Sequence, residues 1–415
     1  MLYNGSKNKY SSTMMRLSMF LNRNFKAILA SLCFVGIVAF LSSNSVHDES
    51  VHEHYNGGSL RKSSNDKGYS QYFGGAIRAG YFPVEGSKMS DNQFRFAAVT
   101  DLDQLSRVSG KTKPEFYSIL QPGYITRDDG SNKYSIHFDN TRKLVSKHNE
   151  AGRGMELSEL TVYQDRLLSF DDRTGSVFEL LNKEGGMETF VTPRFVITEG
   201  NGETDKGMKW EWASVKGKDL YLGSMGKEYT REDGSIANTN NLWISIINPR
   251  GEIRHVDWEK QYSFVREALG AAPPGYCIHE AVLWSEHMQK WMFLPRRISA
   301  DAYDENIDEK KGSNKLVWID DNFSSSKVVD IKLDKVDRLH GFSTVAFVPG
   351  TKDRHALALR SVEDNCVGGD ESLCKQRTYA IVFDTVTGEV LMDENVFPDQ
   401  VKFEGVEFVD ISTSP

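Results

Sequence analysis

The stretch CIHEAVLWS, residues 277–285, places an acidic residue before a short apolar segment, and four other stretches of the chain likewise place a polar or acidic residue before an apolar segment. The five stretches are MELSELTVY (155–163), KWEWASVKG (209–217), CIHEAVLWS (277–285), HGFSTVAFV (340–348) and FEGVEFV (403–409). Their polar key positions, 52, 69, 63 and 61 residues apart, are Glu159, Glu211, Glu280, Ser343 and Glu404. This spacing fits one four-stranded blade plus loops, and the innermost strands of a propeller converge on its axis. The repeats therefore predict an all-β, five-bladed β-propeller.

The rest of the chain from about residue 92 reads as short apolar segments broken by turn residues, as in an all-β fold. FRFAAV (94–99) is expected to close the ring with the last blade, and residues 124–139 read as a hairpin that turns at Asp129-Gly130. Helical periodicity is scarce, and WEKQYSFVREALG (258–270) is its best example. A sandwich or barrel is the alternative, but a sandwich would not place an acidic residue at the start of corresponding strands in five modules.

The composition excludes several classes of protein. With 39% hydrophobic and 26% charged residues, the chain is neither wholly disordered nor fibrous. Its 50 Lys and Arg residues face 58 Asp and Glu residues, which gives a net charge of −8. A general nucleic-acid binder would need a basic excess to neutralise phosphates, so no nucleic-acid partner is expected. Small phosphorylated substrates remain open, because a metal ion can supply positive charge locally.

The amino-terminal part predicts attachment to a membrane. Several basic residues precede an uncharged apolar run, an arrangement that keeps the amino end cytosolic and the bulk of the chain luminal. The expected parts are a cytosolic tail (1–26), a signal-anchor transmembrane helix (27–43), a flexible luminal stem (44–85) and the propeller domain (86–415). This organisation predicts a single-pass type II protein of the Golgi or endoplasmic reticulum. A cleaved signal peptide, which would give a secreted protein, is the alternative.

Two further features fit a secretory compartment. Cys366 and Cys374 close the short loop CVGGDESLC, and they form either a local disulfide or two unrelated reduced thiols. The triplet Asn322-Phe-Ser is a usable glycosylation sequon in a luminal domain.

The acidic residues of the repeats would repel one another on the propeller axis unless a cation lay between them. Carboxylates with serine or backbone oxygens suit a hard ion with about six to eight oxygen ligands, which favours calcium over magnesium. A His and Cys set for zinc is missing, and the zincin motif suggested by His279-Glu280 fails at Leu283. The chain also lacks a Walker A loop, a GxGxxG turn and a GxSxG elbow, so activity on nucleotides would have to work through a metal.

Two acidic segments and one arginine pair are candidates for the chemistry. Asp101 and Asp103 follow the FRFAAV strand, and Asp172 lies in DDRTG, which joins two strands. One of these aspartates could be a base or orient water beside a metal, while a polar turn is the plain alternative. Arg296, next to Arg297 at the end of WMFLPRR, could clamp a phosphate or simply lie on the surface.

Beyond these patterns, the chain resembles the calcium-activated nucleotidases of the apyrase family, found in vertebrate secretory pathways and in the saliva of blood-feeding insects. The matching stretches cover about residues 90–410 in the family's order. They are GRGMELSEL (152–160), DDRTGSVFEL (171–180), KGMKWEWASVKGKDLYLGSMGKEYT (206–230), PPGYCIHEAVLWSEHMQKWMFLPRR (273–297), EKKGSN (309–314), HGFSTVAF (340–347) and KFEGVEFV (402–409). Glu159 departs from the Asp of vertebrate members, and Trp210 replaces a smaller residue.

This resemblance implies a five-bladed propeller with one calcium ion in its central tunnel. It also implies hydrolysis of nucleoside diphosphates and triphosphates with release of phosphate. The calcium ligands of the family carry over onto Ser158 with its neighbour Glu159, and onto Glu211, Glu280, Ser343 and Glu404. The residues implied for catalysis are Asp172, Asp101, Asp103 and Arg296, and those implied for substrate binding are Arg296, Trp212 and Tyr229. The two aromatic residues could equally be packed within blades.

Two rival functions stay open at this point. One is a calcium-stabilised propeller that binds a ligand without turnover. The other is a propeller glycosidase or lyase, which would need paired carboxylates across a sugar and no calcium set. The resemblance leaves the preferred base open, since salivary members favour adenine nucleotides and vertebrate members favour uracil and guanine diphosphates. It also leaves a homodimer open.

Overall fold

The computed structural model describes residues 69–70, 75–76, 88–90, 92–182, 188–231, 235–364 and 374–411. They all belong to one compact unit, Lys67–Pro415. The predicted tail and signal anchor and most of the predicted stem lie outside the described residues. Within the described residues, no helix is long and apolar enough to cross a membrane. In the predicted stem, β1 (Tyr69–Ser70) pairs with β2 (Gly75–Ala76) in an antiparallel fashion.

The described residues form five antiparallel blades of a β-propeller, so the predicted all-β, five-bladed architecture is confirmed. From the innermost strand outward, blade 1 consists of β26 (Phe403–Glu407), β4 (Gln93–Thr100), β5 (Phe116–Arg127) and β6 (Tyr134–Phe138), and blade 2 of β8 (Leu157–Tyr163), β9 (Arg166–Asp171), β10 (Ser176–Asn182) and β11 (Thr189–Val196). Blade 3 consists of β12 (Trp212–Lys216), β13 (Asp219–Gly223), β16 (Trp243–Ile247) and β17 (Ile253–Asp257). Blade 4 consists of β18 (Tyr276–Ser285), β19 (Lys290–Ser299), β20 (Lys315–Asp320) and β21 (Ser326–Asp330), and blade 5 of β22 (Gly341–Phe347), β23 (His355–Asp364), β24 (Lys375–Asp384) and β25 (Val390–Val396).

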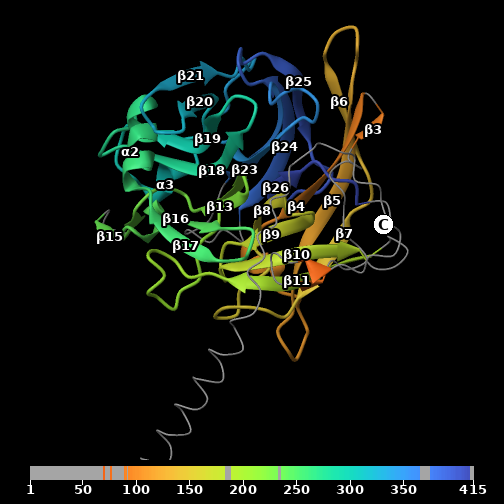
Figure 1. Ribbon diagram of the computed structural model, residues 1–415, viewed down its shortest axis with the longest axis vertical. Coiled ribbons are helices and arrows are strands. Elements are labelled where there is room, and N and C mark those ends of the chain that lie inside the picture. Colours follow the sequence, from red (N-terminus) through yellow and green to blue (C-terminus); the bar gives the residue numbers. More distant parts are fainter. Residues whose placement is uncertain are drawn as a thin grey trace, which may run out of the picture. The chain divides into compact units, whose positions relative to one another are not determined.

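The five innermost strands form a closed ring. Each contacts the next, in the order β26, β8, β12, β18 and β22, and β22 contacts β26 again. In Figure 1, β8, β18 and β26 lie near the middle, with β6, β11, β17 and β21 at the outside. The key positions of the repeats therefore share one central region, as the repeats predict.

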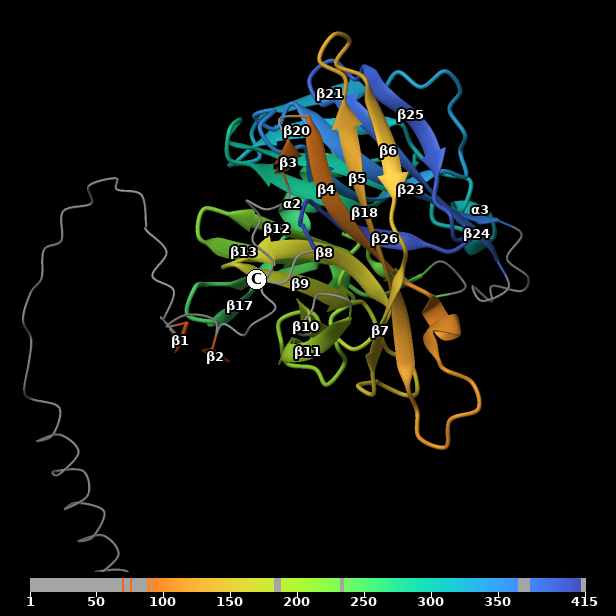
Figure 2. The same cartoon turned by 90° about the vertical axis from the view of Figure 1, so that its right-hand side faces the viewer.

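Blade 1 joins the two ends of the propeller. The last strand, β26, pairs with β4, which confirms the expected closure of the ring by FRFAAV. The long strand β5 pairs with β6 near one end and with β7 (Arg142–Ser146) near the other, and β3 (Lys88–Ser90) adds to the outer end of β4. Figure 2 shows β4, β5 and β6 side by side. Asp128 accepts hydrogen bonds from the N–H groups of Gly130 and Ser131, which holds the predicted turn of this hairpin.

Hydrophobic side chains hold the blades together at their faces. Among the described residues, five buried apolar clusters occur, and each lies between two neighbouring blades. In β9, for example, Leu167 packs toward blade 1 while its neighbour Leu168 packs toward blade 3. Because successive side chains of a strand point to opposite faces, a strand buried on both faces is apolar throughout. The clusters place the inner strands around a common axis.

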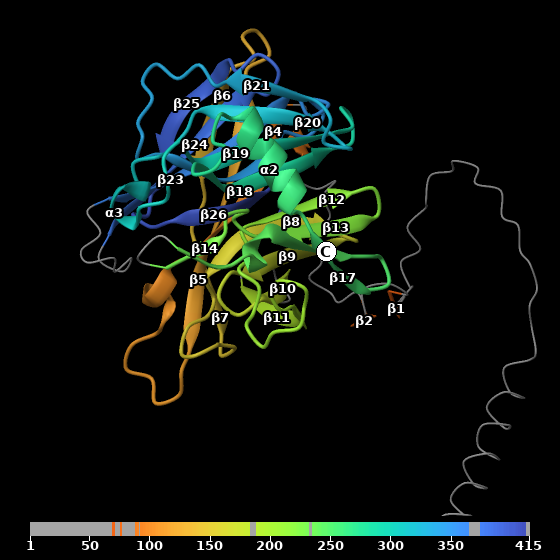
Figure 3. The ribbon, with the colours of Figure 1, turned by 90° about the vertical axis from the view of Figure 1, so that its left-hand side faces the viewer.

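The remaining elements are short and lie in the connections. The predicted helix near residues 258–270 is confirmed as α2 (Glu259–Ala268), whose Tyr262 and Val265 pack into the cluster between blades 3 and 4. Figure 3 shows α2 beside β20 and β21, which it contacts. The others are η2 (Asp103–Ser106), η3 (Asn240–Leu242), α3 (Glu305–Asp308), β14 (Tyr229–Thr230) and β15 (Ile236–Asn238).

Candidate active site

Four of the five inner strands carry a bulge at a polar residue, and in the fifth, β12, a polar residue directly precedes the strand. These residues are Ser158, Glu211, Glu280, Ser343 and Glu404. At four of them the pairing with the next strand skips the residue, and at the fifth both Glu211 and Trp212 face Gly223. Such bulges re-aim a side chain and are common near active sites. In blade 2 the equivalent residue is therefore Ser158 rather than its neighbour Glu159.

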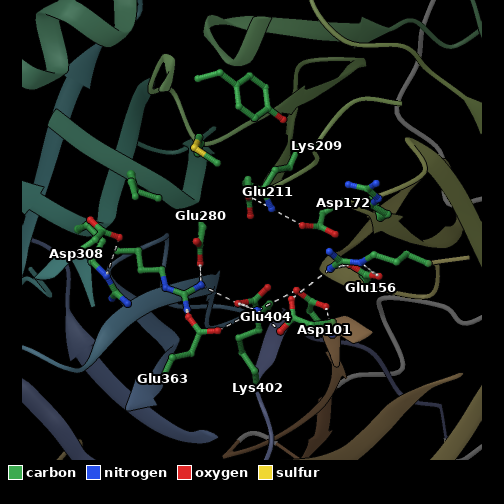
Figure 4. A pocket seen from close by; sticks show the side chains of 18 of the residues that line it. Asp101, Glu156, Asp172, Lys209, Glu211, Glu280, Asp308, Glu363, Lys402 and Glu404 are labelled. Carbon is green, nitrogen blue, oxygen red and sulfur yellow. Dashed lines mark hydrogen bonds and ion pairs between the residues drawn. The ribbon is translucent and has the colours of Figure 1, made fainter. Parts of the chain in front are cut away.

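The inner strands and their connections enclose a strongly charged cavity of about 250 Å³. Its lining includes nine carboxylates and seven basic side chains, a formal excess of two negative charges. Ten of these residues are labelled in Figure 4, and they point toward one another from several blades. The carboxylates are Asp101, Asp103, Glu156, Asp172, Glu211, Glu280, Asp308, Glu363 and Glu404, and the basic residues are Arg153, Arg173, Lys206, Lys209, Arg296, Arg297 and Lys402.

Arg296 lies at the centre of this cavity and is fully engaged with carboxylates. Its Nη1 donates to Glu280 Oε2 at 2.6 Å and to Glu404 Oε1 at 2.7 Å, and its Nη2 donates to Glu363 Oε2 at 2.7 Å. The side chain is skipped in the pairing of β19 with β18, which turns it inward beside Glu280. The structure thus brings Arg296 into the predicted site, but its donors are already used within the protein.

Two lysines that the sequence did not single out, the buried Lys402 and the partly exposed Lys209, neutralise other carboxylates. Lys402 Nζ lies 3.0 Å from Asp101 Oδ2 and 3.2 Å from Asp103 Oδ2, and Lys209 Nζ lies 2.8 Å from Glu211 Oε1 and contacts Asp172. Both lysines stand two residues before a key glutamate, in KWE and KFE. Alternation along a strand places such a pair on one face, so this pattern is the signal that could have found them.

The carboxylates differ in how much positive charge lies close to them, and their pKa values differ accordingly. Burial raises the pKa of Glu211 to about 8, although Lys209 favours its charged form. Repulsion from Glu280 and Asp172 contributes to the same rise. The pKa of Glu363, in contrast, falls to about 2 in spite of burial, because Lys402 and two arginines lie close. The positive charge around Glu211 therefore compensates burial and repulsion less completely than the positive charge around Glu363 does.

Asp172 and Asp101 differ in how their oxygens are used. Asp172 Oδ2 accepts a hydrogen bond from Lys209, while Oδ1 has no partner among the described residues. Both oxygens of Asp101 are engaged, one by the N–H of Asp103 at 2.8 Å and the other by Lys402. Burial raises the pKa of Asp172, whereas the nearby Lys402 lowers that of Asp101 against the effect of burial. Asp172 is thus the aspartate with a free acceptor.

In the DDRTG segment, one aspartate stabilises the turn and the next one faces the cavity. Asp171 accepts hydrogen bonds from the backbone N–H groups of Arg173, Thr174 and Met155, which fixes the turn. A Cβ on Gly175, whose φ is +68°, would lie 2.3 Å from a backbone oxygen, so only glycine fits there. These constraints present Asp172 to the cavity.

Asp101, Asp103 and Glu156 form a second acidic group, with ligand atoms that lie within 4.8 Å of one another. Arg153 holds Glu156 through two hydrogen bonds and lies 3.8 Å from Asp103. Burial and repulsion from Asp101 raise the pKa of Glu156 to about 8. This group shares the cavity with Glu211, Glu280 and Glu404, so the site offers carboxylate oxygens from two groups of residues.

The donor set of the bulge residues fits a hard cation such as calcium. All five are carboxylates or serine hydroxyls, which are oxygen ligands. The hydroxyl of Ser158 is buried without a hydrogen-bond partner among the described residues, while Ser343 donates to the carbonyl of Phe403 at 2.9 Å. A buried unpartnered hydroxyl is costly unless a ligand engages it. The negative excess of the cavity points to the same conclusion.

The remaining predicted site residues lie in different surroundings. Glu159 accepts hydrogen bonds from the hydroxyl of Thr344 and from the N–H of Leu160, and it does not line the cavity. Trp212 is fully buried in the cluster between blades 3 and 4, so the structure does not bring it to the cavity either. Tyr229 does line the cavity.

Comparison with known proteins identifies the family of this chain. The family model described as Apyrase matches residues 102–409. The chain belongs to the apyrase family. This apyrase is 38% identical to the rat (Rattus norvegicus) "Soluble calcium-activated nucleotidase 1" over 321 residues, which is 76% of the chain and 74% of that protein. It is 36% identical to the "Apyrase" of Cimex lectularius over 319 residues, which is 76% of the chain and 83% of that protein. The resemblance drawn from the motifs is thereby confirmed.

Proposed function

We propose that the protein is a calcium-dependent phosphohydrolase of nucleoside diphosphates and triphosphates. The observation that carries the proposal is the set of oxygen-bearing residues on the inner strands, three of which, Glu211, Glu280 and Glu404, line a cavity with a formal excess of two negative charges. Membership of the apyrase family supports nucleotide hydrolysis, and the name of the rat relative supports calcium. An acidic cavity can take an anionic phosphate when a cation offsets its charge.

Ser158, Glu211, Glu280, Ser343 and Glu404 are the residues proposed to hold the ion. Bound there, calcium would offset the negative charge of the phosphate oxygens and of the transition state. Asp172 is proposed as the general base, because its Oδ1 is free to accept a proton from the attacking water. Asp101 is the alternative base, and its two engaged oxygens make it better suited to hold Lys402.

The base of the nucleotide is proposed to lie against the less polar part of the cavity. Tyr229, Met225 and Ile278 are its uncharged lining residues. Lys206 donates to the hydroxyl of Tyr229 at 2.8 Å, which fixes the ring. A ring held in this way offers a face to any base, because stacking tolerates different bases. We leave the base preference to a substrate panel.

The test is phosphate release by the full-length protein from UDP, GDP, ADP and the matching triphosphates. We expect release with calcium, none with EGTA, and a strong loss in Glu211→Ala at unchanged circular dichroism. If the folded protein binds calcium and nucleotide but releases no phosphate from any substrate, it is a binding module and the proposal is wrong.

We also propose that the chain is held in the membrane of the secretory pathway by residues 27–43, with the propeller in the lumen. The support is the basic flank of this run and the disulfide-bonded state of Cys374, whose predicted partner Cys366 lies outside the described residues. Asn322, in an exposed turn, is the proposed glycosylation site. In microsomes, protease protection of the propeller and a mobility shift that Asn322→Gln removes would support this topology. Cleavage by external protease would contradict it.

A further inference from the structure

Arg297 follows Arg296 in β19 but has a very different environment. Its side chain is buried, with 2% of the residue exposed, and it lines the cavity. Its Nε and Nη1 have no hydrogen-bond partner among the described residues. The nearest carboxylate, Asp308, lies 3.8 Å from Nε and also accepts a hydrogen bond from the hydroxyl of Tyr276. Arg297 is therefore a buried cation with unused donors.

The backbone at two glycines packs closely against this guanidinium and its strand. Arg297 pairs with Gly312 in an isolated bridge, and a Cβ on Gly312 would lie 2.5 Å from the carbonyl oxygens of Arg338 and His340. A Cβ on Gly341 would lie 2.3 Å from Nη1 of Arg297. These glycines belong to EKKGSN, to which the proposed catalytic chemistry assigns no role, and to HGFSTVAF, which also contains the proposed calcium ligand Ser343. Both motifs build the slot that holds Arg297.

Donors without partners on a buried guanidinium are costly, and the comparable group of Arg360 leaves only Nε without a partner among the described residues. Arg360, equally buried, contacts Glu394 and donates to the carbonyl of His340 at 2.8 Å. Arginine presents several N–H groups in a planar fork that matches the oxygens of a phosphate. The unused donors at Arg297 therefore suit an anion that enters from the cavity.

We propose that Arg297 is a substrate-binding residue that takes the phosphate group of the nucleotide that is not attacked, which is the α-phosphate of a diphosphate. The proposal rests on the proposed function and assigns to Arg297 the role that the sequence suggested for Arg296. Asp308, the neighbour of Arg297, lies across the cavity from Asp172 in Figure 4. A nucleotide that extends from Arg297 to Asp172 therefore crosses the cavity that is lined by the proposed calcium ligands Glu211, Glu280 and Glu404.

The test compares equilibrium binding by the full-length protein with calcium present. The probes are α,β-methylene-UDP, which resists hydrolysis between its phosphates, together with UMP, uridine and inorganic phosphate. Arg297→Gln should lower the affinity for the diphosphate analogue by about 10- to 100-fold, because hydrogen bonds between charged groups are lost. Binding of uridine should not change, and binding of UMP should weaken as much as that of the analogue, because UMP carries the α-phosphate. Loss of inorganic phosphate binding alone would mark a free-phosphate site and overturn the assignment to substrate.

Two further variants keep the result decisive. Arg297→Lys retains the charge without the fork and should lose less affinity than Arg297→Gln, which also covers the case that the glutamine variant does not fold. Arg250→Gln, at an exposed arginine paired with Glu252, is the matched control and should bind all probes as the wild type does. Unchanged binding of the analogue by folded Arg297 variants would overturn the proposal, even if the wild type hydrolyses UDP. Analogue binding that depends on Arg297 without any hydrolysis would contradict the proposed function instead.

Discussion

The centre of the cavity and its wall near β19 use neighbouring arginines in opposite ways. At the centre, Arg296 bridges three carboxylates, and each of these bonds is 2.7 Å or shorter. At the wall, Arg297 has one carboxylate at 3.8 Å and two N–H positions without a described partner. Both residues are at least nine-tenths buried, so burial does not explain the difference.

The difference separates groups that hold the site together from groups that await a ligand. A buried ion pair tolerates burial because the partners replace water, whereas a lone buried charge is expensive. Arg296, Lys209 and Lys402 keep the converging carboxylates in place. The free Oδ1 of Asp172, the free hydroxyl of Ser158 and the donors of Arg297 are the atoms left for ion, water and substrate.

The largest effect on activity should come from removing the free acceptor oxygen of Asp172. We expect Asp172→Asn to lower kcat by about 10²- to 10⁴-fold, the usual contribution of a general base, with a smaller change in KM. Steady-state phosphate release measures this, and Asp334→Asn, at an exposed carboxylate, is the control. A variant with wild-type kcat would move the base to Asp101.

The two arginines should differ sharply in their effect on stability. Arg296→Met leaves Glu280, Glu363 and Glu404 without their shared partner and should lower the free energy of unfolding by about 3–5 kcal/mol. Arg297→Met removes a charge that is already unpaired and should change it by less than about 1 kcal/mol. Chemical denaturation of the EGTA-treated variants measures both values. Equal losses would show that Arg297 is a structural residue like its neighbour.

The pH dependence of the free energy of unfolding tests whether burial raises the pKa values of the carboxyl groups around the site. Burial raises the pKa of Asp171 to about 7, so its contribution to stability is present in full below its usual pKa and is lost as the pH rises toward 7. Each such carboxyl should lower the free energy of unfolding of the EGTA-treated protein by about 1.4 kcal/mol per pH unit over this window. Denaturation curves at several pH values check this, and Asp171→Asn should have a smaller slope. Stability that rises over the same window would contradict these pKa shifts.

The smallest effect is expected at the less polar edge of the cavity. Tyr229→Ala should raise KM for nucleoside diphosphates by about 5- to 10-fold through lost stacking. Tyr229→Phe keeps the ring and should stay within about twofold of the wild type. KM values for UDP, GDP and ADP measure the effect, and equal KM values in both variants would place the base elsewhere.

The fold could be predicted from the sequence because the signal is repeated. Five similar stretches at blade spacing determine the number of blades, and FRFAAV is the one strand left to pair with FEGVEFV. In blade 2 the repeat predicted Glu159, whereas the bulge lies one residue earlier, at Ser158. The offset arises from the bulge at Ser158, because a bulge moves one residue out of the regular alternation of a strand.

The chemistry could be predicted less completely, because pairing between distant residues leaves little trace in one sequence. Arg296 looked like a phosphate clamp, but its partner Glu404 is more than a hundred residues away. Trp212 looked like a base platform, but Trp258 and Trp291 enclose it in the core. The sequence gives the residue types at the site, and the folded chain decides which of their atoms remain free.

The most direct test of this account is a calcium titration of the EGTA-treated protein in which bound calcium and phosphate release from UDP are followed together. We predict one calcium ion per chain at the bulge residues, activity that rises in proportion to its binding, and the loss of both in Glu404→Gln. Full activity in EGTA, or calcium binding by folded Glu404→Gln with the affinity of the wild type, would contradict the account.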